Sequence, residues 1–304
     1  MTDTTSPPGS LIGLDGQIQW AELLLGPGTP FQIDRDGLTG WADLPSLDSS
    51  DADRPTAHGA WPGARWARPR SVSAGIWLLP EAGAGAAPGA PADLLDTFIR
   101  AFGTGSADAE QWLAVRLHGR TTAVRARVTQ RTVPTDRRFA TGGATRVSVQ
   151  WTATDPRRYE PEARTVSLGL PRRGNGTTYP FTYPVDYGTP GSGGSGSAVN
   201  SGTTETCPVV EFTGPVRRPH LLNHTTGRSL EYDIVLGPGE RLTVDTREGT
   251  VLIGPRASRL HTATAVSSPE QSFVLPPGEN RLDFRALDGD PTTSAQLTWR
   301  AAHL

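Results

Sequence analysis

The sequence lacks features that define several large classes of protein. Among its 304 residues there is no lysine, so all 29 basic residues are arginine, and the only cysteine is Cys207. A single cysteine cannot form an intrachain disulfide, so the fold has to be stable without one. Apolar residues make up 36% of the chain, and no apolar run approaches the roughly 18 residues that a membrane helix needs. These absences argue against a disulfide scaffold and against a helical membrane protein.

The net charge argues against nucleic acid and membranes as partners, and the N-terminal residues argue against a secretory signal. The formal net charge is -2, so the molecule as a whole is not attracted to nucleic acid or to an anionic membrane. Residues 1–8 do not contain a basic region followed by an apolar one, so we expect no secretory signal. We expect neither a membrane nor a sequence-specific nucleic acid as partner. Cys207 is predicted to be a buried and inert thiol, because no histidine is placed nearby to activate it.

What the chain does contain is glycine and proline, 35 and 27 residues respectively, which is typical of many short strands joined by turns. Alternating apolar residues predict strands in the first half at 17–25, 31–33, 70–79, 111–117, 121–130 and 145–153. One helix is predicted, because Leu94, Phe98 and Phe102 recur at i, i+4 and i+8 after a possible cap at Asp93. Residues 39–68 have no period and are predicted to be a long loop.

The second half of the chain predicts a separate domain. The pair Asp155-Pro156 breaks regular structure, so we place domains at residues 1–158 and 159–304. Short strands with turn residues between them predict a β-sandwich. The predicted strands are 165–170, 209–212, 220–223, 230–236, 240–245, 250–253, 271–275, 280–286 and 295–299. Residues 188–202 are rich in glycine and serine and are predicted to be a flexible loop.

No set of residues predicts catalysis, a cofactor or a metal. His220 and His224 flank a predicted strand end, where a four-residue spacing does not place two imidazoles on one face, so we expect them to be exposed turn residues. Four carboxylates could supply a glycosidase pair, but any β-sandwich of this size contains as many. They are Asp233, Asp245, Glu248 and Asp283. Our expectation is a protein that is not an enzyme and holds neither cofactor nor metal.

Two groups of residues are candidates for a subunit interface. Trp41, Trp61 and Trp66 lie in the long loop and have two interpretations: they cover a small core, or they anchor a neighbouring subunit, where tryptophan and arginine are enriched. Arg125 and Arg127 lie on the outer face of a predicted strand. They are solvated, form ion pairs between subunits or, as a third interpretation, bind nucleic acid, although the interleaved aromatic residues of a single-strand binder are missing.

The order of these strands and turns resembles the distal tail protein family of long-tailed bacteriophages. The resemblance is strongest in the second half of the chain, and no enzyme motif competes with it. The segments that carry it are the break at 155–159, the strand 164–170, the turn 223–227, the hairpin 239–254, the strand and turn 273–280, and Trp299-Arg300. In the first half, a strand at 18–24, Pro30-Phe31 and the strand–helix–strand order of 70–117 are also similar.

The resemblance implies a fold, a role and partners. It implies a mainly β protein, with an N-terminal β-rich belt domain that contains one helix and a C-terminal galectin-like β-sandwich. Six copies of such a protein form a ring between the tail tube and the tail-tip or tail-spike proteins, and DNA passes through the hole. It also implies that the protein is made in the bacterial host cytoplasm and located in the virion. On this basis we expect Arg125 and Arg127 to lie at an interface or on the exterior, away from the hole.

A second interpretation is a carbohydrate-binding module of the tail tip that contacts a glycan of the host cell wall. Tyr179, Tyr183 and Tyr187 lie on one predicted loop, and exposed tyrosine rings there would stack on sugars. The same residues would otherwise pack the loop. Binding of glycans by the C-terminal domain distinguishes this interpretation from a purely structural role.

Overall fold

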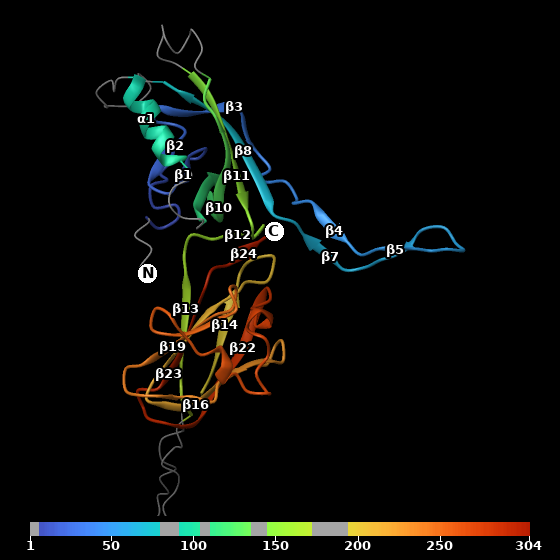
Figure 1. Ribbon diagram of the computed structural model, residues 1–304, viewed down its shortest axis with the longest axis vertical. Helices are drawn as coiled ribbons and strands as arrows, with labels where there is room; N and C mark the ends of the chain where they lie inside the picture. The colour runs from blue at the N-terminus through green and yellow to red at the C-terminus, as the bar shows by residue number, and fades with distance from the viewer. Residues whose placement is uncertain (1–5, 80–90, 104–109, 135–144, 172–193) are drawn as a thin grey trace, which may run out of the picture. The chain divides into compact units, whose positions relative to one another are not determined.

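A computed structural model describes residues 6–79, 91–103, 110–134, 145–171 and 194–304, and contacts divide the chain into compact units of residues 2–161 and 162–303 (Figure 1). Each unit is mainly β, and the described residues contain one α-helix. The predicted fold class, a β-rich N-terminal part with one helix followed by a β-sandwich, is therefore confirmed.

The N-terminal unit is built around one antiparallel sheet with the strand order β2-β1-β9-β10-β11-β8-β3, and β12 lies beside β10. Its strands are β1 (Ile18–Trp20), β2 (Leu23–Leu25), β3 (Phe31–Thr39), β8 (Arg70–Leu78), β9 (Gln111–Leu117), β10 (Arg120–Thr132), β11 (Thr145–Ala153) and β12 (Arg158–Tyr159). A short turn joins β2 to β3, and the amide of Gly26 donates to the carbonyl of Phe31 at 2.7 Å. The two ends of the sheet therefore meet. The alternation predicted from the sequence is clearest in β8 and β11, where every second side chain is buried.

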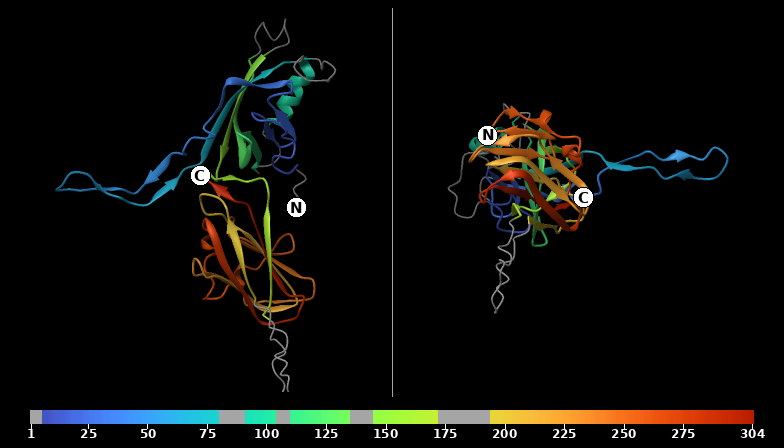
Figure 2. Two further views of the ribbon diagram at one scale, coloured as in Figure 1. Left: turned by 180° about the vertical axis from the view of Figure 1, so that it is seen from behind. Right: turned by 90° about the horizontal axis from the view of Figure 1, so that it is seen from below.

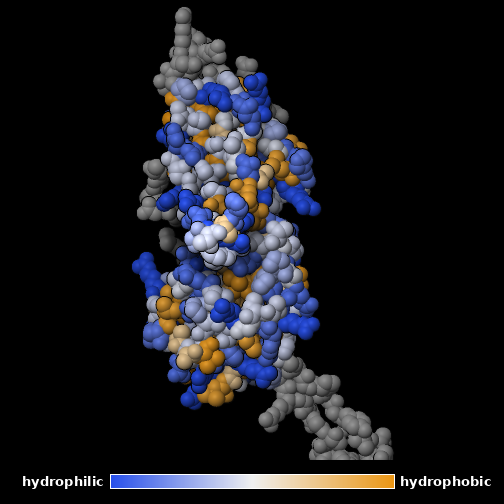
Figure 3. All heavy atoms as spheres, turned by 90° about the vertical axis from the view of Figure 1, so that its right-hand side faces the viewer, coloured by the Kyte–Doolittle hydropathy of each residue, from blue (hydrophilic) through white to orange (hydrophobic). Residues whose placement is uncertain are grey.

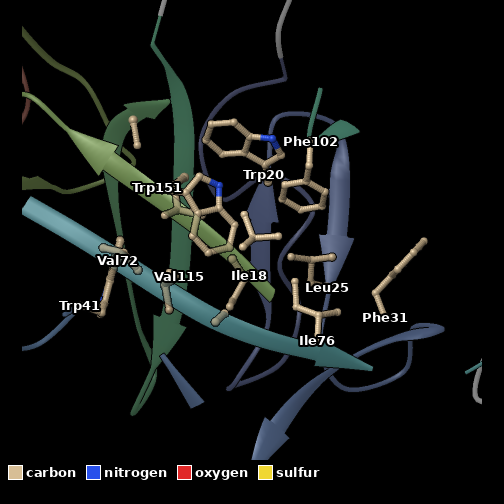
Figure 4. Close-up of a cluster of buried hydrophobic side chains, with 14 of the residues drawn as sticks. Ile18, Trp20, Leu25, Phe31, Trp41, Val72, Ile76, Phe102, Val115 and Trp151 are labelled. Carbon is tan, nitrogen blue, oxygen red and sulfur yellow. The ribbon is translucent and has the colours of Figure 1, made fainter. Parts of the chain in front are cut away.

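The core of this unit contains a group of aromatic side chains, among them Trp20, Phe102 and Trp151 (Figure 4), and the helix α1 (Pro91–Ala101) contributes Phe98 to it. Phe102, directly after the helix, stacks on Trp20 with ring centroids 6.3 Å apart and meets Trp151 edge-on at 5.8 Å. The indole of Trp20 also donates to the carbonyl of Ala101 at 2.8 Å, which satisfies one of the carbonyl groups that every helix end leaves free. The predicted cap is wrong, because the helix begins at Pro91 and Asp93 lies inside its first turn.

Residues 40–69 leave the sheet between β3 and β8 and form a two-stranded ribbon rather than the irregular loop that the sequence predicted. Strand β4 (Leu47–Ser49) pairs with β7 (Arg65–Ala67), and β5 (Ala52–Asp53) pairs with β6 (Ala60–Trp61). Figures 1 and 2 show this ribbon projecting away from the sheet of its own unit. The sequence of these strands does not alternate between apolar and polar residues, because such alternation requires one buried face and nearly all of these side chains are exposed.

The C-terminal unit is a sandwich of two antiparallel sheets with an apolar core between them. The first has the order β13-β23-β15-β19-β20-β21 and the second the order β14-β22-β16-β17, with β18 beside β16. The strands are β13 (Arg164–Gly169), β14 (Ser195–Asn200), β15 (Val209–Thr213), β16 (Val216–Asn223), β17 (Arg228–Glu231), β18 (Val235–Leu236), β19 (Arg241–Asp245), β20 (Thr250–Ile253), β21 (Ala257–Ser258), β22 (Gly278–Gly289), β23 (Ser294–Trp299) and β24 (Ala302–His303). The short 3-10 helices η1 (Leu260–Thr262) and η2 (Glu270–Ser272) follow β21. The sandwich confirms the prediction, whereas its galectin-like character stays a prediction.

Three local predictions in this unit are wrong. Part of the predicted flexible loop is the strand β14, because it pairs with β22 along its whole length and its small residues fit closely: a Cβ on Gly196 would lie 2.4 Å from Leu168. The predicted strand 271–275 begins as η2, in which the buried Glu270 accepts a hydrogen bond from the hydroxyl of Tyr232 at 3.1 Å. The predicted strand 230–236 is divided into β17 and β18, since Tyr232 turns into the core.

Candidate assembly surfaces

The ribbon is anchored to the sheet by a buried base. Trp41 is only 2% exposed and belongs to the core of the N-terminal unit. Gly40, just before it, has a φ of +83°, and a Cβ at this position would lie 2.0 Å from the carbonyl oxygen of Ser71. Only glycine combines this backbone conformation with so close an approach. The chain therefore enters the ribbon through a fixed and tightly packed point.

Arg70 closes the base from the other side, because it is the first residue after the ribbon and is 1% exposed. Its Nη1 donates to the carbonyls of Gly40 at 2.9 Å, Trp41 at 3.0 Å and Asp43 at 2.7 Å. Its Nε donates to the carbonyl of Pro156 at 2.9 Å. Burial, and then the charge of Arg158, lower the pKa of Arg70 to about 10, so it stays charged at neutral pH. One guanidinium thus holds both ends of the ribbon together, a role that the sequence analysis missed.

Beyond this base the ribbon, which we call the arm (residues 43–68), buries very little against its own chain. Trp61 is 53% exposed and Trp66 is 69% exposed, and Leu44 is 66% exposed. The guanidinium of Arg54 lies 5.6 Å from the ring centroid of Trp61, a contact worth about 0.5–1 kcal/mol at an exposed site. An isolated two-stranded ribbon is marginally stable in water. The arm therefore presents large apolar side chains that its own chain does not cover.

The two legs of the arm carry opposite charges. The outgoing leg, residues 43–53, contains only acidic charges: Asp43, Asp48, Asp51 and Asp53. The returning leg, residues 54–68, contains only basic ones: Arg54, Arg65 and Arg68. Arg68 and Asp48 face each other across the ribbon at 3.3 Å. This segregation was readable from the sequence, and it gives the arm one acidic edge and one basic edge.

The three candidate tryptophans therefore have different roles in the structure. For Trp41 the structure favours the core interpretation, because this side chain is only 2% exposed within its own chain. Trp61 and Trp66 lie on exposed strands of the arm and are available for contact. In Figure 3 the arm points toward the viewer, and hydrophobic residues on this face form small separate groups among hydrophilic ones.

The two candidate arginines lie on β10 in different surroundings. Arg125 is half-buried, and its guanidinium lies 5.4 Å from the ring centroid of Trp112 on the neighbouring strand β9. Arg127 is exposed and lies opposite Thr152 on β11. Because Arg125 is half-buried and held by this attraction to the indole ring, Arg127 is the more available of the two.

The C-terminal unit has an open groove of about 610 Å³ on the side of β14 and β22. Its lining residues include His224, Glu279 and Arg281. Beside it, Asp283 is nearly buried and accepts hydrogen bonds from Arg285 at 2.8 Å and from Ser195 at 3.2 Å. The candidate glycan contacts lie outside the described residues: Tyr179, Tyr183 and Tyr187.

Two of the four carboxylates considered for catalysis, Asp245 and Asp283, are engaged in structural hydrogen bonds. Asp245 accepts the amides of Arg247 at 2.9 Å and Glu248 at 3.1 Å, which stabilises a turn. Of the two histidines, His224 is exposed as expected, but His220 lies within β16 and is half-buried. Across the residues that the structure describes, no group of three histidine, cysteine or acidic side chains could hold a metal ion.

Two further predictions concern the cysteine and the membrane. Cys207 is half-buried rather than fully buried. No helix in the described part of the chain is long and apolar enough to span a membrane.

These features define a class of mainly β proteins with two units, one of which carries a projecting arm with exposed aromatic side chains. Residues 201–303 match the family model of the siphovirus-type tail component, C-terminal domain. The predicted resemblance to phage tail proteins is thus confirmed. No curated protein shows a significant match to the chain.

Solved structures of phage proteins share the fold over both units. One is the crystal structure of the SPP1 Dit protein, which is described as a paradigm of hub adsorption apparatus in phages that infect Gram-positive bacteria. The TM-score is 0.55 and the sequence identity is 12%, and the match covers 90% of this chain and 94% of that chain. Another is a chain of the phage P2 baseplate in its activated conformation with calcium. Here the TM-score is 0.51 and the sequence identity is 8%, and the match covers 93% of this chain and 96% of that chain. At sequence identities this low, the structural similarity shows that the fold is shared.

Proposed function

We propose that this protein is a structural subunit of the phage tail hub, and that six copies form a ring that joins the tail tube to the tail-tip proteins and lets DNA pass. The proteins that share its fold are described as parts of a hub adsorption apparatus and of a baseplate. In this role the chain needs no catalytic residues and no cofactor. Its work is to bind copies of itself and the tail proteins on either side.

The observation that carries this proposal is the arm. It is built on a rigid base at Arg70, and it exposes Trp61 and Trp66 on a ribbon that is marginally stable alone. Aromatic residues are enriched in the centres of protein interfaces. A projecting element that binds a different surface of the next copy gives a head-to-tail contact, and such contacts form a ring when the rotation from one copy to the next closes. Arg127 then belongs to the exterior or to an interface, and we propose that it does not line the hole.

Native mass spectrometry of the full chain, with negative-stain images of the same sample, tests this proposal. We expect a hexamer whose images show a ring with a central hole. The variant Trp61→Ala/Trp66→Ala should shift the distribution toward the monomer, because it removes the largest exposed side chains of the arm. A wild-type chain that stays monomeric at all accessible concentrations would contradict the proposal, as would an arm variant that assembles as well as wild type.

A second candidate function is binding of a host-wall glycan by the C-terminal unit. The groove beside β14 favours it, because it combines hydroxyl groups of Ser195 and Ser197 with the charges of Glu279 and Arg281. Such groups can hydrogen-bond a polyhydroxylated ligand. A glycan array probed with the full chain and with Glu279→Ala/Arg281→Ala tests this function. Binding that the double variant abolishes supports it, and an absence of binding leaves the structural role alone.

A further inference from the structure

Arg70 carries one donor that its contacts at the base of the ribbon do not use. Its side chain is 1% exposed and is one of the largest fully buried side chains of the chain. Nε and Nη1 donate to backbone carbonyls. Nη2 is buried as well, but no atom of the described residues accepts a hydrogen bond from it. Because buried polar groups are seldom left without a partner, this donor points to a ligand that is not part of the chain.

A second guanidinium with the same property lies close to the first. Arg158 begins β12, two residues after Pro156, whose carbonyl accepts Nε of Arg70 at 2.9 Å. Arg158 is half-buried, and its Nη2 donates to a backbone oxygen of Leu304 at 3.2 Å. Its Nε is buried and has no acceptor within the part of the chain that the structure describes. Two unused donors on two cations therefore lie around the same short segment, residues 156–158.

The charges around these two groups do not cancel. Burial and then the repulsion of Arg158 lower the pKa of Arg70, and the attraction of Asp43, which raises it, comes after both. Burial also lowers the pKa of Arg158. The carboxylate of Asp43 is itself bound to the amide of Gly40 at 3.0 Å, on an exposed residue. At neutral pH the surroundings of Arg70 thus hold an excess of positive charge, and charges buried in this way are normally paired.

We propose that Nη2 of Arg70 and Nε of Arg158 bind a small inorganic anion of the size of chloride. Such an ion accepts a hydrogen bond from each donor and offsets the excess of positive charge. A monovalent ion fits better than a dianion, because burial removes more hydration from the dianion. Entry is on the side of Arg158, since Arg70 has almost no exposed surface. This site lies within one chain, so the inference does not depend on the proposed function.

Thermal unfolding of the full chain at low protein concentration tests the site. Sodium chloride is compared with sodium gluconate at equal ionic strength, because gluconate gives the same screening with an anion that is too large for the site. An ion that binds only the folded chain stabilises it by mass action, so each tenfold rise in chloride above the dissociation constant should raise the folding equilibrium constant about tenfold. Bromide should act like chloride.

Three variants show whether a chloride effect arises at this site. Arg158→Gln keeps a polar side chain without the charge and should lose the difference between chloride and gluconate. Arg158→Lys keeps the charge but not the planar donors, so it should retain part of the difference. Arg35→Gln is the control, because this side chain of the same unit is 92% exposed, and it should behave like wild type. A difference in Arg158→Gln equal to that of wild type would overturn the proposal, as would its absence in wild type.

Crystals of the full chain grown in sodium bromide locate the ion directly and do not depend on any variant. Bromide scatters anomalously, so we expect a peak of anomalous density within hydrogen-bond distance of Nη2 of Arg70 and Nε of Arg158. A water molecule without anomalous signal at this point would overturn the proposal. Bromide peaks beside exposed arginines alone would do the same, since they would show an adventitious ion only.

Discussion

The base and the arm of the same ribbon place one residue type in opposite environments. Trp41 is 2% exposed in the core, whereas Trp61 is 53% exposed and Trp66 is 69% exposed. All three occur in one stretch that is rich in glycine, proline and aspartate. The difference lies in the neighbouring structure, because Trp41 packs against the large sheet, whereas Trp61 and Trp66 lie on a narrow two-stranded ribbon. The environment of an aromatic residue is thus decided by the elements that the fold brings beside it.

This difference divides the ribbon into a part that stabilises the monomer and a part that is available to a partner. The base is held by Arg70 and by close packing at Gly40, so it forms without any other chain. The arm is held by short ladders, a few exposed side-chain contacts and the ion pair of Arg68 with Asp48, and an exposed ion pair of this kind contributes about 0–1 kcal/mol. Substitutions in the base should therefore change the stability of the monomer, and those in the arm should change assembly.

The largest expected effect separates the two tryptophan environments directly. Trp41→Ala should lower the free energy of unfolding of the monomer by about 3–5 kcal/mol, because it leaves a cavity in the core. Trp66→Ala is the matched control and should change it by less than about 0.5 kcal/mol, since the side chain is exposed. Urea unfolding of dilute monomer measures both values. Equal losses in the two variants would contradict the division between base and arm.

The next effect concerns the guanidinium at the base. Arg70→Ala removes the donor for four backbone carbonyls and should lower the free energy of unfolding by about 3 kcal/mol or more, because each buried acceptor left unsatisfied costs about 1–3 kcal/mol. Arg70→Lys keeps a charge but not the planar fork, so it should recover only part of the loss. Thermal unfolding and proteolysis between residues 43 and 68 provide the measurements. Unchanged stability in the alanine variant would show that Arg70 does not hold the base.

A smaller effect is expected from the backbone at the entrance to the ribbon. Gly40→Ala should destabilise the monomer by about 1–3 kcal/mol, from the positive φ and the contact with Ser71. Gly59→Ala is its control at the far end of the arm, where φ is +87° and nothing lies near the added methyl group. In this control only the positive φ lowers the free energy of unfolding, by about 1–2 kcal/mol. A larger loss at Gly59 than at Gly40 would contradict the steric argument.

The sequence predicted those parts of the fold whose side chains alternate between core and solvent. Strands β8 and β11 and the helix with Phe98 and Phe102 were readable for this reason. The arm was not, because a ribbon without a buried face has no apolar period. Strand β14 was missed since its glycine and serine residues fit against Leu168 and pair with β22, and neither contact is local in sequence.

The candidate surface was only partly predictable for a related reason. Composition indicated that tryptophans in a long loop were of interest, but it could not separate Trp41 from Trp61 without knowledge of the sheet. Arg70 looked like an ordinary first residue of a strand, and its role depends on carbonyls of residues 40–43 and of Pro156. The opposite charges of the two legs could have been read from the sequence, since they lie in consecutive blocks.

The smallest expected effect is a dependence of stability on pH at the turn between β9 and β10, which Asp15 binds. The amide of Gly119 and then Arg116 lower the pKa of Asp15 in the folded state, so its ionised form stabilises the fold. That contribution is complete above the unfolded pKa of about 3.9 and is lost as the pH falls through the lower, folded value. Asp15→Asn should therefore reduce the urea midpoint at neutral pH, and the difference from wild type should shrink below about pH 4. Asp53→Asn on the arm, the control, should leave the midpoint unchanged, and a gap for Asp15→Asn that widens in acid would contradict the assigned role of this carboxylate.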